Sequence, residues 1–543
     1  MDCDVLVYGG TAAGVVAAVT VAAGGRRVVL VEPGRHVGGM TSGGLGWTDF
    51  GHKRAVGGRA QGFYRRVGDH YERTLGTRTF TEQNQFRKGS WANTAGEPDD
   101  GTCYVFEPSV AEAVLEQMIA EAGPNLRVLR EHRVRTTDVT DGQIERVHLD
   151  IAPAGAFNEP GESVTGSVTI EPRFCIDCSY EGDLLASAGC GFRVGREANS
   201  VFGETLNGIA AETHKHQVHV PVDPYRTAGD PDSGLIAYVS DEPFGEPGGG
   251  DTCLQAYNLR LCLTQRDDLR LPITPADDHD PADFELVRRF VTAADATDDG
   301  TTLTRHLKLD PVPNGKTDVN NQGGVSTDFI GQNHAYATAD YAERGRLWRT
   351  HLRWIRGLLH TLAHDPQVPA HIREEMGSWG LCRDEFTDTG GWSHQLYVRE
   401  ARRLVGLATM TEHHCTRRET IDDPVGLAAY QMDSHNCRRL VIDGRVQNEG
   451  DVQVPPTGPY PISYRALVPA SGATRNLLVP VCCSASHIAF GSIRMEPVFM
   501  VLGESAALAA LACLETEAAA AELPYDKLAQ ALADAGQVCT FDE

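Results

Sequence analysis

The chain opens with MDCDVLVYGGTAAGVVAAVTVAAGGRRVVLVEPGRHVGGM, residues Met1 to Met40, and this stretch decides the fold. The apolar run Val5 to Tyr8 is short and ends at a glycine pair, which predicts a fully buried parallel strand. A helix is predicted from Gly14 to Ala23, where a second glycine pair stops it. Residues 27–32 (RVVLVE) predict another buried strand. The order strand, glycine turn, helix, strand predicts a nucleotide-binding unit.

The turn and the second strand carry the groups that a dinucleotide needs. Glu32 lies eighteen residues beyond Gly14, where such folds place a carboxylate that accepts hydrogen bonds from ribose hydroxyls. Glycine permits the tight turn, and the helix N-terminus offers amide hydrogens to a pyrophosphate. Thr11 replaces the middle glycine of GxGxxG, so it should push the pyrophosphate back slightly, although its hydroxyl can donate to phosphate. The predicted phosphate-binding residues are Gly9, Gly10, Thr11, Ala12, Ala13 and Gly14.

A glycine-rich run, GRHVGGMTSGGLG, follows the acidic residue directly. Its glycine pairs permit close backbone approach to a long ligand, and the alternative is a flexible loop. The unit resembles the FAD domain of the glutathione-reductase superfamily, in which a glycine pair after the ribose-binding acid continues along the cofactor. Nicotinamide-binding units generally lack such a pair, so the resemblance implies FAD rather than NAD. The implied contacts are Gly38, Gly39, Met40, Gly43 and Gly44.

Length and composition exclude several classes of protein. The 543 residues leave room for two or three domains, and 49 basic against 74 acidic residues give 49 − 74 = −25. This charge disfavours a nucleic-acid or anionic-membrane partner. The first strand begins at residue 4, which leaves no room for a signal peptide and predicts a cytoplasmic protein. The apolar stretches 15–23 and 498–513 are interpreted as buried helices, because the first is short and the second contains Glu504. Fourteen cysteines in so long a chain favour a reducing compartment.

A second cofactor-contacting turn is predicted further along the chain. Polar residues 53–100 are expected to cover the cofactor, and a helix (110–122) and two extended segments around Asp141-Gly142 follow. Residues 173–190 (RFCIDCSYEGDLLASAGC) resemble the superfamily's second strand-turn at the cofactor. That resemblance implies contacts from Val134 (to adenine), Cys178, Ser179 and Asp183. Cys175 and Cys178 form a CxxC, which could be a redox dithiol or half a zinc site. No second CxxC exists, and Cys175 falls on the alternating face of a strand.

The middle of the chain predicts a separate domain. Prolines, glycines and acids dominate residues 203–320, with a strand-like run at 254–265, and residues 334–376 are mainly helical. His360 and His364 form an HxxxH without a neighbouring acid, so we interpret them as a solvated helix face and predict no metal site. The predicted fold class is α/β, a Rossmann-like FAD/NAD(P)-binding domain of glutathione-reductase type with an inserted sheet-containing substrate domain. The FAD-binding domain takes residues 1–202 and 465–543, and the substrate domain takes 203–464.

Motifs along nearly the whole chain resemble the FAD-oxidored family, whose bacterial members are often labelled xanthan-lyase-like. They are GGTAAG, HVGGM, LYVREARRLVG, YRALVP and SASHIAFGSIRMEPVFMVLGESAALAA. In the wider superfamily, which includes fumarate reductase, the last helix points its N-terminus at the flavin pyrimidine, where negative charge develops. The resemblance implies cofactor contacts from Arg494, Met495 and Glu496. Arg494 would lie near the flavin N1 and C2 carbonyl, and the alternative is a surface arginine that caps a helix.

Hydride transfer from a C–H bond to flavin N5 needs a group that takes the accompanying proton, and histidine has a suitable pKa. His487 is favoured over His394 and His435 because it is expected in the loop before the flavin-facing helix; alternatively it only holds that loop. Arg399 could orient a carboxylate or polyol. However, YVREARR has helical spacing with Glu400, so an ion-pair network is an equal alternative. The predicted catalytic residues are His487, Arg399, Tyr464 and His394.

The sequence therefore predicts an FAD-dependent oxidoreductase that dehydrogenates a small polar substrate, with a secondary alcohol of a sugar or polyol as the leading class. Electrons would pass to oxygen or a carrier. The alternatives are a flavin-dependent reductase or C=C desaturase, and a non-catalytic FAD-binding or partner-binding protein. A homo-oligomer and covalent flavin attachment through His36 or a cysteine both stay open.

Overall fold

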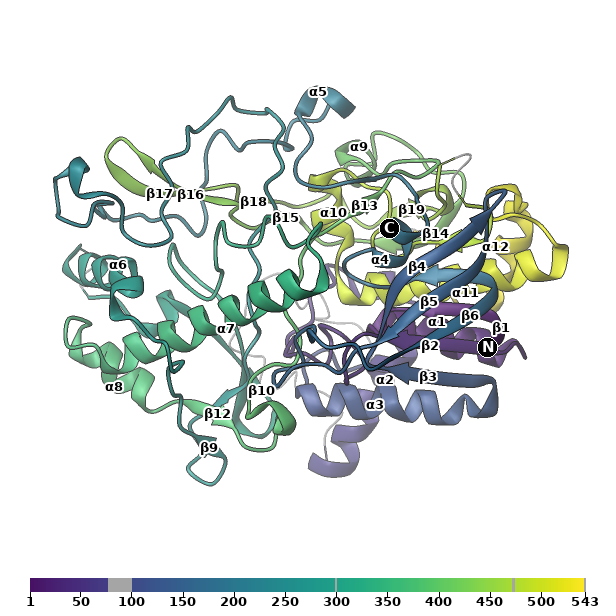
Figure 1. Cartoon of the computed structure of the whole chain (residues 1–543), viewed down its shortest axis with the longest axis horizontal. Coiled ribbons are helices and arrows are strands. Elements are labelled where there is room, and N and C mark those ends of the chain that lie inside the picture. Colours follow the sequence, from purple (N-terminus) through teal and green to yellow (C-terminus); the bar gives the residue numbers. More distant parts are fainter. Residues whose placement is uncertain (77–99, 298–299, 471–473, 542–543) are drawn as a thin grey trace. The chain divides into compact units, whose positions relative to one another are not determined.

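The structure is a computed structural model that describes residues 1–76, 100–297, 300–470 and 474–541. The chain forms two compact units (Figure 1): unit 1 comprises residues 1–194, 400–432 and 454–543, and unit 2 comprises 195–399 and 433–453. The sequence prediction ended the first segment at 202 and began the last at 465, whereas unit 1 also takes 400–432 and 454–464. Two strand pairs hold these added segments in unit 1: β7 with β13, and β14 with β19. Of the segment expected to cover the cofactor, residues 77–99 lie outside the described residues.

Unit 1 is built on a seven-stranded sheet of order β3-β2-β1-β6-β5-β4, with β20 paired to β6. The strands β3, β2, β1, β6 and β20 run parallel, and β5 and β4 continue the sheet antiparallel. The bounds are β1 Asp2–Tyr8, β2 Val28–Glu32, β3 Leu126–Arg130, β4 His132–Thr140, β5 Gln143–Ile151, β6 Gly166–Asp177 and β20 Leu477–Leu478. This mixed α/β unit with a parallel sheet is the predicted FAD-binding Rossmann-like fold.

Both faces of β1 and β2 are largely buried, which explains why their sequences contain continuous apolar runs. Leu6 and Cys175 lie in register on neighbouring strands, within the same core cluster. Val5 and Val7 alternate with them and are fully buried as well. Burial on two faces therefore selected the β-branched residues from which the sheet was predicted.

Helices α1 and α11 form the core layer of unit 1. They approach so closely that a Cβ on Gly503 would lie 2.5 Å from the carbonyl oxygen of Ala13. By length and composition α11 could cross a membrane, but 83% of its apolar window is buried inside the structure. The helices of unit 1 are α1 Ala12–Ala23, α2 Gly58–Leu75, α3 Pro108–Glu121, α4 Asp183–Ser187, α9 Glu412–Cys415, α10 His487–Ile493, α11 Glu496–Thr516 and α12 Tyr525–Asp534. Its short strands are β7 Phe192–Arg193, β13 Arg403–Leu404, β14 Pro424–Ala428 and β19 Tyr460–Ser463.

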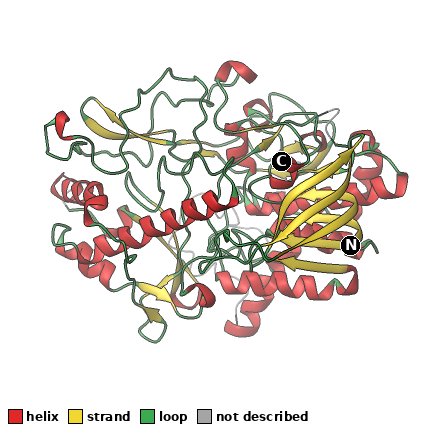
Figure 2. Cartoon of the chain, viewed as in Figure 1, coloured by secondary structure: helices red, strands yellow, loops and turns green. Residues whose placement is uncertain are grey.

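Unit 2 combines a small antiparallel sheet with helices and long loops, as the secondary-structure colours of Figure 2 show. The sheet has the order β10-β11-β8-β12-β9, and β16 and β17 form a hairpin. The bounds are β8 Leu263–Thr264, β9 Arg270–Leu271, β10 Leu307–Val312, β11 Lys316–Asn321, β12 Gly380–Cys382, β16 Arg438–Ile442 and β17 Arg445–Glu449. The helices are α5 Asn199–Phe202, α6 Glu285–Thr297, α7 Tyr341–His364 and α8 Ala370–Gly377, and β15 (Met432–Ser434) pairs with β18 (Val452–Val454).

The sheet-containing insertion and its helical segment were predicted, but two details were wrong. The run 254–265 forms a strand only at 263–264, with isolated bridges at Asn258 and Leu261. Residues 397–402, read as helical from the spacing of their charges, are extended and lead into β13. Arg399 and Arg402 pair with acids distant in sequence, and Glu400 pairs with both the distant His487 and the nearby Arg403, so the spacing reflects no helix.

Candidate functional site

The turn after β1 accepts only glycine at two positions. Gly9 has φ 94°, and a Cβ there would lie 2.6 Å from the backbone nitrogen of Ser179. A Cβ on Gly14 would lie 1.9 Å from the carbonyl oxygen of Gly9. Helix α1 begins two residues earlier than predicted because the Thr11 hydroxyl oxygen caps it by accepting from the Gly14 amide at 3.2 Å. The predicted Ala12 and Ala13 are fully buried in its first turn. No side chain therefore projects from the chain at Gly9 or Gly14, next to the N-terminus of α1.

Thr11 takes a different role from the predicted one. Its hydroxyl donates to the carbonyl oxygen of Cys178 at 2.9 Å, which joins the first glycine turn to the turn after β6. The hydroxyl is therefore committed to the protein rather than to phosphate. Cys178 in turn donates its amide to the carbonyl oxygen of Tyr8 at 2.7 Å.

Glu32 ends β2 with its carboxylate held by two backbone amides. Gly10 N donates to Oε2 at 2.8 Å, and Gly34 N donates to Oε1 at 2.6 Å. Burial raises the pKa of Glu32 to about 7, against the lowering effect of these two hydrogen bonds. Each carboxylate oxygen can accept more than one hydrogen bond, so the group remains able to accept from ribose hydroxyls.

The glycine-rich loop after β2 folds back on the first turn. Gly38 N donates to the carbonyl oxygen of Gly10 at 2.7 Å, and Gly38, Gly39 and Gly44 all have positive φ. The amide of Gly43 donates to the carbonyl oxygen of Gly39 at 2.8 Å. The loop is thus an ordered structure of backbone hydrogen bonds, not the flexible linker that was the alternative.

A buried hydrogen-bonded group, which we call the Tyr180 node, ties three segments together: it consists of Tyr180, Glu496, Thr41 and the Met40 amide. The Tyr180 hydroxyl donates to Glu496 Oε1 at 2.7 Å and accepts from Met40 N at 2.9 Å. The Thr41 hydroxyl donates to Glu496 Oε2 at 2.6 Å. Burial raises the pKa of Glu496 to about 7 although both hydroxyls lower it.

The Tyr180 node joins the loop after β2, the turn after β6 and the first residue of α11. The two ends of the chain that were predicted to contact FAD therefore do meet. Sequence reasoning missed Tyr180, although a signal existed: this position carries a large aromatic residue where the resembling superfamily has small ones.

The turn after β6 is held by its own acid. Asp177 accepts from the amide and hydroxyl of Ser179 at 3.0 and 2.6 Å, and burial raises its pKa to about 6. Asp183 begins α4 and forms an ion pair with Arg402 at 2.8 Å. The thiols of Cys175 and Cys178 are fully buried, and burial raises their pKa well above the usual value. Because a thiolate is the nucleophile and the metal ligand, these two cysteines are structural.

A buried histidine–carboxylate pair lies at the start of α10. His487 Nδ1 lies 2.7 Å from Glu400 Oε2, and Glu400 Oε1 forms an ion pair with Arg403 at 2.8 Å. The Arg403 guanidinium also donates to the carbonyl oxygen of Ala485 at 2.7 Å. The prediction that His487 lies in a loop was wrong, because it is the first residue of a helix that Ser486 caps. The chain passes from α10 through the buried residues Arg494 and Met495 into α11.

The fold, the glycine turn after β1 and the glycine-rich loop after β2, which we together call the FAD cradle, agree with the comparison with known families. A family model described as FAD dependent oxidoreductase matches residues 4–532. The chain belongs to this family. No protein among the curated proteins compared with it matches.

Solved structures that resemble this FAD-dependent oxidoreductase share little sequence with it. The p-nitrophenol 4-monooxygenase from Pseudomonas putida DLL-E4 is 15% identical over 38% of this chain and 51% of its own, with a TM-score of 0.22. The 3-ketosteroid-delta4-(5alpha)-dehydrogenase from Rhodococcus jostii RHA1 is 14% identical over 32% and 45%, with a TM-score of 0.20. The anhydrotetracycline hydroxylase from Streptomyces rimosus is 14% identical over 45% and 43%, with a TM-score of 0.24. The matched parts thus span about half of these chains or less.

The residues present fit FAD. Added side chains at Gly9, Gly14 and Gly39 would collide with neighbouring atoms, so the backbone there is bare. Glu32 would hold the adenosine ribose, the N-terminus of α1 would face the pyrophosphate, and the loop 38–44 would continue along the cofactor. Val134, the predicted adenine contact, is buried in β4 and donates its amide to the Tyr8 hydroxyl at 3.2 Å.

Two other predicted catalytic residues of the oxidoreductase belong to unit 2. The Arg399 guanidinium lies 2.9 Å from Asp328 Oδ1 and also donates to the carbonyl oxygen of Ala256. Asp328 Oδ2 lies 2.7 Å from His435 Nδ1. His394 is buried, with its ring edge-on to Phe386. Arg399 is therefore engaged in an ion pair, the alternative that its charged neighbourhood had left open.

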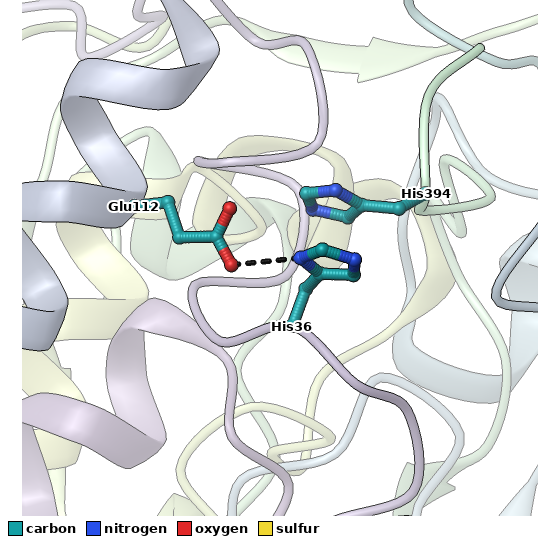
Figure 3. Close-up of side chains that lie close together, drawn as sticks. All are labelled: His36, Glu112 and His394. Atoms are coloured by element: carbon teal, nitrogen blue, oxygen red, sulfur yellow. Dashed lines mark hydrogen bonds and ion pairs between the residues drawn. The ribbon is translucent and has the colours of Figure 1, made fainter. Parts of the chain in front are cut away.

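The remaining candidates have structural partners. The buried Tyr464 hydroxyl donates to the carbonyl oxygen of Ala520 at 2.9 Å, and burial raises its pKa well above the usual range. An acid or base role for Tyr464 is not supported. His36 Nδ1 lies 2.8 Å from Glu112 Oε1, and Figure 3 shows the two side chains pointing toward each other. His394, also drawn there, is described with unit 2.

Proposed function

We propose that this FAD-dependent oxidoreductase dehydrogenates a small polar substrate at a secondary alcohol of a sugar or polyol, with His487 as the base. The observation that carries the proposal is the buried chain His487–Glu400–Arg403 in the unit that holds the FAD cradle. FAD, when bound, supplies the two-electron oxidant for the carbon that loses hydrogen.

The geometry suits His487 to proton transfer. Glu400 forms an ion pair with Arg403, and the carboxylate of such a pair can only accept a hydrogen bond. The proton of the neutral imidazole is therefore on Nδ1, and the lone pair is on Nε2. A carboxylate behind the ring also stabilises the imidazolium that forms once Nε2 takes the hydroxyl proton. Arg403 in turn fixes the carboxylate and, through the Ala485 carbonyl, the turn before α10.

The experiment is anaerobic reduction of the bound flavin by sugars, polyols and hydroxy acids, with product analysis. His487→Gln should keep FAD but slow flavin reduction about 100- to 10,000-fold, the usual contribution of a general base. His148→Gln is the matched control, because His148 also pairs with a carboxylate (Asp138, at 3.1 Å) but on the surface strands β4 and β5.

Unchanged reduction by the His487 variant would remove it as the base. If no alcohol bleached the flavin while an alkene reoxidised the reduced protein, the reductase alternative would replace alcohol dehydrogenation. A ketone or aldehyde product supports the proposal, and a C=C product would identify a desaturase.

A further inference from the structure

Unit 2 contains a buried group of charged residues that the proposed chemistry at His487 does not use. We call it the Arg439 cluster: the buried Arg439, Asp328, Arg399 and His435, and the half-buried His216. The carboxylate of Asp328 contacts both His435 and Arg399. Although burial would raise it, Arg399 and His435 hold the pKa of Asp328 at about 2.

Arg439 differs from the other buried arginines nearby. Its Nε donates to Asn448 Oδ1 at 3.0 Å and its Nη2 donates to the carbonyl oxygen of Gly324 at 3.1 Å, and both acceptors are neutral. Its Nη1 has no hydrogen-bond partner among the residues that the structure describes, and its side chain is 2% exposed. By contrast, Arg196 is paired with Glu449 at 2.7 Å and Arg260 with Asp318 at 2.8 Å.

A buried guanidinium without an ionic partner is unfavourable, since desolvation of a charge is repaid only by a counter-charge with good geometry. Burial lowers the pKa of Arg439 to about 10, with Asp328 opposing, so the group is still a cation at neutral pH. Two further acids of the region are engaged elsewhere: Asp433 lies 3.5 Å from His435 Nε2, and Asp451 accepts from the Gln453 amide. The positive charge of Arg439 therefore has no carboxylate of its own in the described part of the chain.

The same framework positions two imidazole rings. Asn448, which accepts from Arg439, donates its amide to the carbonyl oxygen of His216 at 2.8 Å, and Asn436 donates to that oxygen at 3.1 Å. The His216 ring lies nearly parallel to that of His435, with centroids 6.3 Å apart. His216 has φ 51°, a left-handed conformation that is unfavourable for a residue with a side chain. The hydrogen bonds to its carbonyl oxygen stabilise this strained backbone conformation, and such strain often occurs at functional sites.

We propose that the Arg439 cluster is a binding site for a small carboxylate, with Arg439 as the residue that pairs with it. Arginine binds carboxylates by parallel N–H···O bonds, and Nη1 is available for this. The His216 imidazole can donate to a hydroxyl of a hydroxylated acid, whereas both ring nitrogens of His435 face carboxylates. A sugar acid or hydroxy acid is therefore the expected class of ligand.

The test compares D-glucuronate with D-glucose as probes, because they differ by a carboxylate in place of a hydroxymethyl group. Calorimetric titration of the FAD-loaded protein should give glucuronate at least a tenfold advantage. Arg439→Gln should lower the glucuronate affinity about 10- to 100-fold, the usual contribution of a charged hydrogen bond, while glucose binding stays unchanged. Arg445→Gln, an exposed position on the same β16–β17 hairpin, is the matched control and should bind glucuronate normally.

Equal binding of the two sugars by the wild-type protein would overturn the proposal, and so would equal losses in the two variants. If Arg439→Gln fails to fold, Arg439→Lys keeps the charge but not the two-pronged geometry, and it should bind glucuronate with intermediate affinity. Binding is measured without turnover, so failure of the proposed dehydrogenation leaves this test intact.

Discussion

Tyr180→Phe removes one hydroxyl from the Tyr180 node and should weaken FAD binding. The change takes from Glu496 one of its two side-chain donors, a charge-assisted bond worth about 1.5–3 kcal/mol, and leaves the Met40 amide unsatisfied at about 1–3 kcal/mol. The two losses are not additive, because Glu496 has a pKa of about 7 and can take up a proton instead. We expect a net loss of about 2–4 kcal/mol, which would lower FAD affinity by about 30- to 1,000-fold if it falls on the cofactor-bound form.

The assay is FAD titration of the apoprotein at several pH values between 5 and 8. The defect should shrink as the pH falls, because a protonated Glu496 depends less on its donors. Tyr464→Phe is the control: it loses one neutral hydrogen bond to the Ala520 carbonyl, should cost about 1 kcal/mol of stability, and should leave FAD affinity unchanged at every pH. An FAD affinity of Tyr180→Phe equal to that of the wild type, or a defect independent of pH, would refute the reasoning.

Two further predictions concern the cradle. Gly14→Ala should give colourless protein, because its Cβ would overlap the Gly9 carbonyl oxygen at 1.9 Å, whereas Gly62→Ala, which meets nothing within 4 Å, should stay yellow; flavin absorbance of the purified variants decides. The stability of the apoprotein should fall as the pH rises from about 4.5 to 7, because the folded state keeps the proton on Glu32 (pKa about 7) after the unfolded chain has lost it. This carboxyl contributes at most about 3 kcal/mol to the change, and urea unfolding across this range should show a flatter profile for Glu32→Gln; an equally steep profile would assign the pH dependence to other groups.

The start of the parallel sheet could be predicted from the sequence because its first two strands contain apolar runs bounded by glycine or a polar end. Val5 to Tyr8 and the stretch ending at Glu32 are examples, and their burial on both faces leaves no room for polar alternation. The long C-terminal helix was predicted for the same reason, since its length and proline start are local properties.

The site was less predictable because its contacts are remote in sequence. Arg399 pairs with Asp328 and Glu400 with His487, and no spacing rule relates such partners. The regular spacing of charges in 397–403 therefore suggested a helix where the chain is extended. The Thr11 hydroxyl was predicted to donate to phosphate, but it donates to the carbonyl oxygen of Cys178, which is distant in sequence. Arg439 was missed because its significance is that no carboxylate among the described residues pairs with it, which only the folded structure reveals.

The bond from Thr41 to Glu496 links groups 455 positions apart. A ribosome must therefore make nearly the entire polypeptide before the Tyr180 node can form, even though the glycine turn after β1 emerges first. Prematurely terminated products that lack α11 should stay apoprotein, and cofactor capture in the cell would act as a late checkpoint that distinguishes finished molecules from fragments.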